Sequence, residues 1–311
     1  MVTSSGEALG ALLSISNDLA DAVERAGRSL VAVNARRHSP STGIYWGNGM
    51  VVTADHTLER DENITVTLPD GRSMAATIAG RDAGTDIAVL KVEGVDLPAA
   101  ELADAEALRV GHVVLAVARP GSSGVSASWG AVSAVGDAWR TWAGGQIDRL
   151  VHPDLTMYPG FSGGPLVNAQ GQVVGMNTSG LSRNMALTVP VSTVRRVAEQ
   201  LLSRGRVARG YLGLAMQSVR LPDSLVRSLD ITEKTGLIVV SVENEGPAEK
   251  AGFMVGDILI ALDGRHVDST DAIQSVLDPD RVGTSITARI IRGGSPAELA
   301  ITVGERPGRG E

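Results

Sequence analysis

The sequence contains no cysteine among its 311 residues. This absence excludes disulfide bonds, thiol nucleophiles and zinc sites built from cysteine, and it fits any redox compartment. Aromatic residues are also scarce, at 3% of the chain, whereas there are 37 glycines. Together with frequent valine, alanine and threonine, this composition favours β-structure with many tight turns over a helical bundle.

A basic block and a long apolar run are missing as well. The net charge is −7, and without a basic block nothing indicates a nucleic-acid groove or a polybasic contact with a membrane. The apolar stretch at residues 9–13 lacks a basic lead-in and is too short to span a bilayer. The chain as given therefore shows no signal or anchor, and the residues alone leave its compartment open.

The length predicts more than one domain, because 311 residues exceed what one hydrophobic core usually organises. An apolar stripe behind residues 16–18 predicts a short helix over 17–26. Short β-prone runs then form two series, over 29–92 and 113–189. Each series is sufficient for a barrel.

The pattern after Pro190 predicts a helix with Ser192 as its cap and an end near Gly205. Its apolar residues should share one face, namely Val194, Val197, Ala198, Leu201 and Leu202. From Gly210 onward a small α/β module is expected, with strands at 236–242, 256–262, 285–291 and 297–303 and helices at 247–251 and 270–277.

Ser162 is the candidate nucleophile, in the run Gly-Phe-Ser-Gly-Gly-Pro at residues 160–165. A serine hydroxyl is a poor nucleophile unless an imidazole takes its proton and N–H donors hold the oxyanion. Gly160 lets the backbone turn so that the amides of Gly160 and Ser162 converge as such an oxyanion hole. Without other support, a plain glycine-rich turn before a strand is the commoner interpretation.

Support comes from two upstream motifs. His56 follows the β-branched run at residues 51–53, and Asp86 stands at the head of the apolar strand 87–92, where a buried carboxylate needs a donor such as an imidazole N–H. The alternative for His56 is a surface-loop role. The competing carboxylate is Asp82, but its turn-like stretch Arg-Asp-Ala-Gly predicts a solvated position and so favours Asp86. The order His56, Asp86, Ser162 is that of chymotrypsin-type enzymes.

These motifs closely resemble those of HtrA-type (Deg-type) serine proteases, and Arg209–Leu214 with Asn244–Leu259 looks like that family's PDZ domain. The resemblance covers roughly residues 20–304. It implies a mainly β fold: a double six-stranded β-barrel of the chymotrypsin/trypsin type, followed by a small α/β PDZ domain. The expected parts are an N-terminal segment at 1–27, the protease domain at 28–204, a linker at 205–209, the PDZ domain at 210–304 and a frayed tail at 305–311.

The resemblance also implies roles for single residues. His56 is general base and then general acid, Asp86 orients it, and the amides of Gly160 and Ser162 form the oxyanion hole. The specificity pocket, expected to take a small or medium apolar side chain, is assigned to Thr156, Met157, Asn177, Thr178 and Ala186. In the PDZ module the peptide-binding residues are Tyr211, Leu212, Gly213 and Leu214, with a linker turn as the alternative.

By the same resemblance the chain is expected to degrade unfolded or misfolded proteins, to capture hydrophobic peptide C-termini, and to form a homotrimer or a larger assembly through its N-terminal segment. The expected location is the periplasm or cell envelope if the given sequence lacks an export segment of the protein, and the cytoplasm otherwise. No cofactor is implied. No metal is expected, because the remaining histidines lack ligand spacing: His38, His112, His152 and His266.

One departure from the family pattern and one loop leave alternatives open. Phe161 stands where the family usually has asparagine, so the oxyanion hole could be distorted, and an inactive peptide-binding holdase or scaffold is the alternative function. The loop at 136–148, with Trp139 and Trp142, resembles the family's regulatory loop. Two tryptophans covering the end of a barrel are the plainer interpretation.

Overall fold

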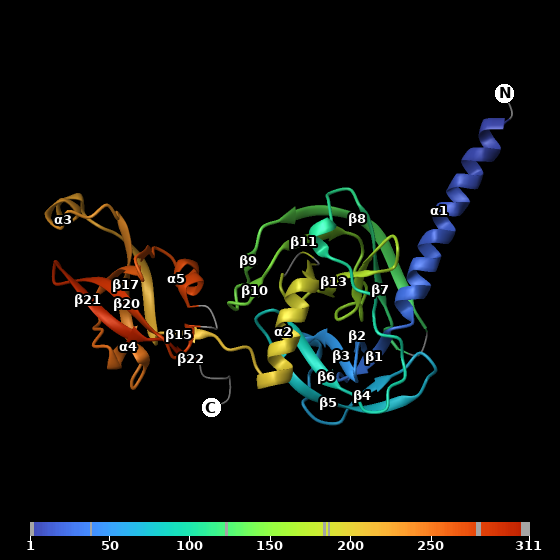
Figure 1. The fold of residues 1–311 in the computed structure, drawn as a ribbon, viewed down its shortest axis with the longest axis horizontal. Coiled ribbons are helices and arrows are strands. Elements are labelled where there is room, and N and C mark those ends of the chain that lie inside the picture. Colours follow the sequence, from blue (N-terminus) through green and yellow to red (C-terminus); the bar gives the residue numbers. More distant parts are fainter. Residues whose placement is uncertain are drawn as a thin grey trace. The chain divides into compact units, whose positions relative to one another are not determined.

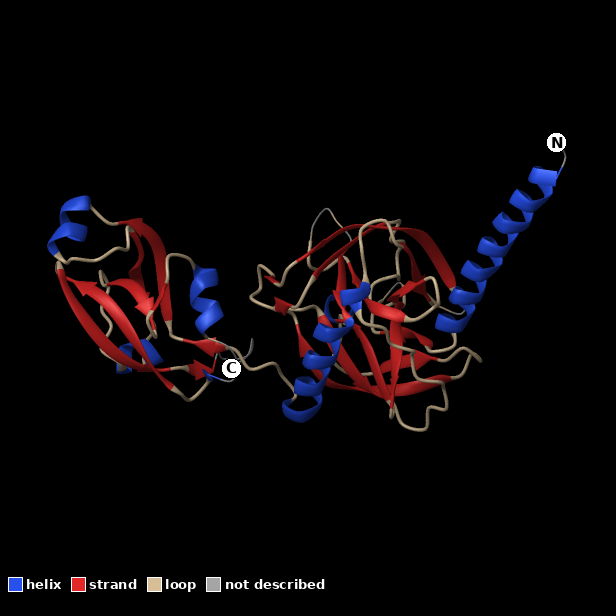
Figure 2. Ribbon diagram, turned by 45° about the horizontal axis from the view of Figure 1, so that its top comes forward, coloured by secondary structure: helices blue, strands red, loops and turns tan. Residues whose placement is uncertain are grey.

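The computed structural model describes residues 3–37, 39–121, 124–182, 185, 187–277 and 281–305. The chain divides into two compact units, Met1–Val207 and Ala208–Glu311. Strands predominate in both units (Figure 2). Among the helices in the described ranges, none has the length and apolarity needed to cross a membrane.

The first six strands close into a barrel in the order β1-β2-β3-β6-β5-β4. Alternation produces its interior, because Ile64, Val66 and Leu68 all point inward and are at most 1% exposed. The strands are β1 (Leu30–Asn34), β2 (Ser41–Gly47), β3 (Met50–Ala54), β4 (Ile64–Thr67), β5 (Ser73–Asp82) and β6 (Ile87–Lys91).

The next strands form a second six-stranded antiparallel sheet in the order β11-β8-β7-β12-β13-β14. With the barrel it confirms the expected mainly β, double-barrel class. Its strands are β7 (Val113–Ala118), β8 (Ser126–Gly136), β11 (Leu150–Asp154), β12 (Pro165–Asn168), β13 (Val173–Thr178) and β14 (Leu187–Pro190), and a two-stranded ribbon of β9 (Trp139–Arg140) and β10 (Gln146–Ile147) stands beside them.

Helix α2 (Val191–Arg204) ends at Gly205, as the sequence predicted, and the φ of 72° makes this glycine a left-handed cap. Its start differs from the prediction, because Pro190 is the N-cap and no side chain caps the helix. The predicted apolar face is also narrower, since Leu201 is fully buried whereas Leu202 is 39% exposed.

Helix α1 (Thr3–Gly27) is much longer than the helix predicted over 17–26. Only its C-terminal part packs against the barrels, where Ala22 and Ala26 are buried. The remainder projects away from them (Figure 1) and exposes more than half of each of four apolar side chains: Leu9, Leu12, Leu13 and Ile15.

The second unit has its own hydrophobic core and a six-stranded antiparallel sheet, in which the order is β16-β17-β18-β20-β21 and β19 pairs with β18 beside this row. The predicted hairpin turns at Gly293-Gly294, where both φ angles are positive. Its elements are β15 (Gly210–Tyr211), β16 (Leu214–Arg220), α3 (Asp223–Ser228), β17 (Thr235–Val242), α4 (Pro247–Lys250), β18 (Ile258–Leu262), β19 (Arg265–His266), α5 (Thr270–Val276), β20 (Ser285–Arg292), β21 (Ser295–Thr302) and β22 (Gly304–Glu305).

Candidate active site

The register of β3 and β6 brings His56 and Asp86 together. Ala54 pairs with Ile87, so the residues just beyond this pair lie next to one another at the same end of the two strands. The main-chain N–H of Asp55 donates to the carbonyl of Asp86 at 3.1 Å and extends the pairing by one step. A short 3-10 turn, Asp55–Thr57, then presents the His56 imidazole.

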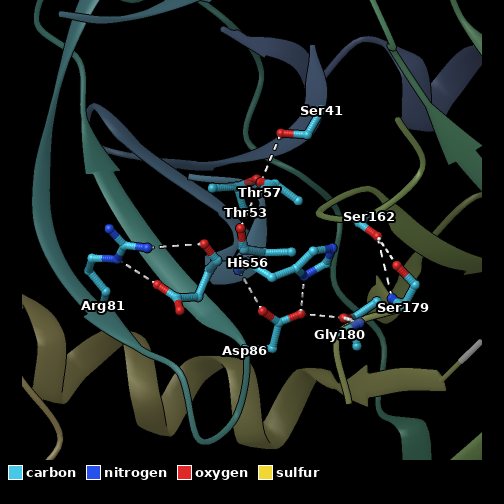
Figure 3. Close-up of polar contacts among 12 residues, drawn as sticks. Ser41, Thr53, His56, Thr57, Arg81, Asp86, Ser162, Ser179 and Gly180 are labelled. Atoms are coloured by element: carbon cyan, nitrogen blue, oxygen red, sulfur yellow. Dashed lines mark hydrogen bonds and ion pairs between the residues drawn. The ribbon is translucent and has the colours of Figure 1, made fainter. Parts of the chain in front are cut away.

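His56 and Asp86 form a two-point contact (Figure 3). The Nδ1 atom of His56 lies 2.7 Å from Oδ2 of Asp86, and the main-chain N–H of His56 donates to Oδ1 at 2.8 Å. Asp86 is buried and has a left-handed backbone, with φ of 57°. Because the carboxylate accepts the Nδ1 proton, the Nε2 atom of His56 is left as the proton acceptor.

The competing carboxylate, Asp82, has a different task. Its oxygens accept hydrogen bonds from the main-chain N–H groups of Gly84 and Thr85 and from the Thr85 hydroxyl, the last at 2.7 Å. Asp82 is 6% exposed, so the expectation of a solvated turn residue is wrong. It closes the turn that leads to Asp86.

Ser162 lies across from His56 but its hydroxyl has another partner (Figure 3). The Ser162 Oγ atom is 3.2 Å from the Ser179 hydroxyl oxygen, and the Ser179 main-chain N–H donates to it at 3.4 Å. In the described part of the chain no hydrogen bond joins Ser162 to His56. The candidate nucleophile and the candidate base are therefore neighbours without a hydrogen bond between them.

The turn around Ser162 requires a glycine at position 160. Gly160 has a φ of 89°, and a Cβ atom there would lie 2.5 Å from Cβ of Pro120. Only glycine fits this position. Within the described residues, the N–H groups of Gly160 and Ser162 have no hydrogen-bond acceptor.

Phe161 points into the second barrel and is 2% exposed. It packs on Ala116 and Ala118, and its ring meets that of Tyr158 edge to face at 5.5 Å. The small alanines leave room for the phenyl group. The phenyl side chain, which replaces the family's asparagine, thus lies beneath the turn that carries Ser162.

The residues assigned to the specificity pocket are not equivalent. Thr156 is exposed, whereas Met157 is partly buried against the Phe161 cluster. Asn177 is fully buried, and its side-chain oxygen accepts a hydrogen bond from Thr188 at 2.9 Å. Ala186 lies outside the described residues.

Thr178 contacts the proposed catalytic carboxylate instead of lining an open pocket. It is 1% exposed, and its hydroxyl donates to Oδ2 of Asp86, while the Gly180 N–H donates to the Thr178 oxygen at 2.8 Å. A Cβ atom at Gly180 would lie 2.7 Å from both Asp86 Oδ2 and His56 Nδ1. Sequence reasoning assigned Thr178 to the wrong place and did not find Ser179 and Gly180. The signal that could have located them is the pairing of β12, which follows Ser162, with β13, which ends at Thr178.

An ion pair stands behind His56. Arg81 Nε lies 2.6 Å from Oδ1 of Asp55, and Arg81 also pairs with Asp61. Burial raises the pKa of Asp55, although Arg81 opposes the shift. The arginine therefore compensates a carboxylate held in a poorly solvated position beside the imidazole.

The predicted peptide-binding residues run from the end of β15 to the start of β16, and some of their main-chain groups are already hydrogen-bonded. The carbonyls of Leu212 and Gly213 accept hydrogen bonds from Ala248 and Glu243, at 2.8 and 2.9 Å. Leu212 is in the core. On or beside α5, Ile273, Val276 and Leu277 are buried as well, whereas β16 lies at an edge of its sheet.

The loop at 136–148 rests on the turn before Asp86. The Thr141 hydroxyl donates to the Gly84 carbonyl at 2.7 Å, and a Cβ atom at Gly145 would lie 2.2 Å from that carbonyl group. Trp142 is 80% exposed, so it does not cover a barrel end, whereas Trp139 packs against the core.

The remaining histidines have separate partners. His112 bonds with Arg109, His152 with Ser133 and His266 with the Ile260 carbonyl. His38 lies outside the described residues. In the ranges that the structure covers, no three potential metal-ligating side chains come together.

Comparison with protein families identifies a domain in each of the two units. Residues 41–176 match the model of the trypsin-like peptidase domain, and residues 210–303 match that of the PDZ domain. Curated relatives are probable periplasmic serine endoproteases of DegP-like type. One from Halomonas elongata is 32% identical over 88% of this chain and 57% of its own length, and one from Pseudomonas fulva is 34% identical over 84% and 54%. The chain thus spans somewhat over half the length of the curated relatives it matches.

Solved structures match over nearly the whole chain. The HtrA-type protease AlgW with tripeptide is 30% identical, covers 93% of this chain and 98% of its own, and has a TM-score of 0.73. The serine endoprotease from Yersinia pestis is 28% identical over 93% and 98%, with a TM-score of 0.75. Both similarities span the two units described above.

Proposed function

Since this chain belongs to the family of HtrA-type proteases, we propose that it is a serine endopeptidase with Ser162, His56 and Asp86 as its triad. The observation that carries the proposal is the 2.7 Å contact between His56 Nδ1 and Asp86 Oδ2. This contact fixes the tautomer that a general base needs.

In the proposed reaction Ser162 attacks the scissile carbonyl while His56 Nε2 takes its proton. The imidazolium that forms is stabilised by Asp86, and the amides of Gly160 and Ser162 donate to the oxyanion. His56 then protonates the leaving amine. Water takes the place of the amine and attacks the acyl-enzyme while His56 accepts its proton, and His56 finally returns a proton to the Ser162 oxygen. Before attack, the Ser162 hydroxyl must leave Ser179 and turn toward His56.

The substrates we propose are unfolded or misfolded polypeptides, cleaved in the course of protein quality control. Hydrophobic C-termini would add as a strand along the free edge of β16, with the loop Tyr211–Leu214 receiving the carboxylate. The positive φ of Gly213, 76°, suits a loop whose N–H groups converge on an anion. The periplasmic naming of the relatives supports an envelope location.

A homotrimer is the assembly we propose, built through the N-terminal segment. Support comes from α1, whose four exposed apolar side chains lie outside the packed part of the helix. Sedimentation velocity on the full chain tests this assembly, and a single monomeric boundary at micromolar concentration contradicts it.

The alternative function is a catalytically weak or inactive peptide-binding holdase or scaffold. The contact of Ser162 with Ser179 in place of His56 favours this alternative. Phe161 does not add to it, because its side chain is buried below the turn.

Covalent labelling distinguishes the two functions. A serine-directed peptidyl phosphonate should label the wild-type chain and leave Ser162→Ala unlabelled, and casein should be cleaved by the wild type alone. Ser203→Ala is the matched control, because Ser203 is an exposed serine on α2 that bonds only its own helix. A folded wild type without labelling and without casein cleavage at any temperature would sink the endopeptidase proposal.

A further inference from the structure

Thr42, on β2 of the first barrel, touches the turn of the second barrel that carries Ser162. Its hydroxyl lies 2.7 Å from the Gly160 carbonyl oxygen, and its main-chain N–H donates to the Ser162 carbonyl at 3.3 Å. One residue thus holds the carbonyl groups of both residues whose amides are the proposed oxyanion donors.

The direction of the Thr42 hydroxyl proton is determined by its partners. The Arg119 main-chain N–H lies 2.9 Å from the same Oγ1 atom. An amide N–H can only donate and a carbonyl can only accept. The Thr42 hydroxyl oxygen therefore accepts a hydrogen bond from the Arg119 N–H. The hydroxyl proton is donated to the Gly160 carbonyl, which is the acceptor of this pair of contacts.

Thr42 is itself held firmly. It is fully buried, and its carbonyl accepts a hydrogen bond from the Thr53 hydroxyl at 2.8 Å. The turn packs directly on this backbone, because a Cβ atom at Gly163 would lie 2.1 Å from the Thr42 carbonyl oxygen. A buried and hydrogen-bonded residue of this kind is rigid enough to fix the position of the groups that bond to it.

We infer that Thr42 is a positioning residue for the oxyanion hole, an inference that rests on the proposed endopeptidase function. A peptide unit is planar, so a carbonyl held by Thr42 fixes the whole unit that contains it. Only the φ and ψ rotations of Gly160 separate its own N–H from that fixed unit, and the same relation holds for Ser162. Thr42 acts through these units and does not touch the substrate.

The residues around the turn complete the arrangement. The Phe161 carbonyl accepts from the Gly164 N–H at 3.0 Å, and the Phe161 N–H donates to the Tyr158 carbonyl at 3.1 Å. Thr42 is the member of this set that comes from the other barrel. It therefore ties the donors to the barrel that carries His56 and Asp86.

The test replaces the hydroxyl while keeping the shape of the side chain. Thr42→Val should lower kcat for a short peptide substrate by roughly 10- to 100-fold with little change in KM, somewhat less than the loss of an oxyanion donor itself. The affinity for a peptide aldehyde, whose adduct carries an oxyanion, should fall in parallel. Thr42→Ser retains the hydroxyl and should restore kcat to within about threefold.

Thr193→Val is the matched control. Thr193 is fully buried and its hydroxyl also accepts a main-chain N–H, from Asp148, but it lies on α2 away from the turn. Equal kcat values for Thr42→Val and Thr193→Val would overturn the role of Thr42 alone, whereas an unlabelled wild type would overturn the endopeptidase proposal and this inference with it. If Thr42→Val does not fold, Thr42→Ala removes the same hydroxyl without placing a methyl group against the Gly160 carbonyl, and the same comparison decides.

Discussion

At the scale of single residues, the Ser162 hydroxyl has two competing directions. Its contact with the Ser179 hydroxyl, at 3.2 Å, opposes the rotation toward His56 that attack requires. A hydrogen bond contributes about 0.5–1.5 kcal/mol net, which corresponds to roughly a 2- to 13-fold population change. The resting partner of Ser162 should therefore influence its reactivity.

We predict that Ser179→Ala raises the second-order rate of phosphonate labelling of Ser162 by about 2- to 10-fold. The substitution removes the competing hydroxyl, although the Ser179 N–H contact stays available. Labelling followed by mass spectrometry over time measures this rate. A labelling rate equal to or below that of the wild type would show that the contact does not restrain the nucleophile.

The sequence was sufficient to select His56, Asp86 and Ser162 as candidates, because each belongs to a local motif of characteristic composition. It was not sufficient for Thr42 and Thr178, which are ordinary threonines in the chain. Their contacts arise only when strands far apart in sequence pair or when two barrels meet. No local pattern encodes such a meeting.

At the scale of elements, α2 offers a direct measure of what one buried side chain contributes. Leu201 is fully buried in the largest core cluster, whereas its neighbour Leu202 is 39% exposed. Both are leucines near the end of the same helix, so helix propensity affects them equally.

Leu201→Ala should lower the free energy of unfolding by about 2–5 kcal/mol, from lost burial and the cavity left behind. Leu202→Ala should cost less than about 1 kcal/mol. Urea denaturation followed by tryptophan fluorescence reports this unit, since all four tryptophans lie in it. Similar losses for the two variants would mean that α2 does not pack through the face described.

The elements that the sequence did not predict have physical reasons. The first half of helix α1 was not predicted, because it contains several serines and glycines, which lower helix propensity. The helix nevertheless begins at Thr3. Strand β11 contains Pro153, which normally argues against a strand, but the register shifts there at a bulge. Strand β2 contains Gly43, and glycine normally weakens a strand prediction. Here the strand needs glycine, because a Cβ atom at this position would lie 2.5 Å from the Val51 side chain.

At the scale of the whole molecule, each unit has its own core, and acid should affect the C-terminal unit through one ion pair. Asp257 is 1% exposed, and both of its oxygens lie 2.7 Å from the Arg292 guanidinium. Burial alone raises the pKa of Asp257, but the bonds from Arg292 and from the Met254 N–H outweigh it and lower the pKa below its ordinary value.

A lowered folded pKa means that this stabilisation is complete above the ordinary carboxyl pKa, near about 4, and is lost as the pH falls through the folded value. We expect Asp257→Asn to be less stable than the wild type at pH 7 and to show a smaller further loss between pH 4 and pH 2. Hydrogen exchange of amides in β18 and β20 measures this unit. Parallel pH profiles for the two proteins would contradict the role of the carboxylate.

The left-handed backbone of Asp86 restricts which amino acids this position tolerates. At a φ of 57° most side chains crowd their own carbonyl group, whereas glycine, asparagine and aspartate accept the conformation. Selection for the turn alone would therefore preserve aspartate or its closest replacements here after catalysis had been lost. In a diverged copy of this domain, an aspartate at this position is therefore evidence only that the turn is kept. Evidence for catalytic activity has to come from the histidine and the serine.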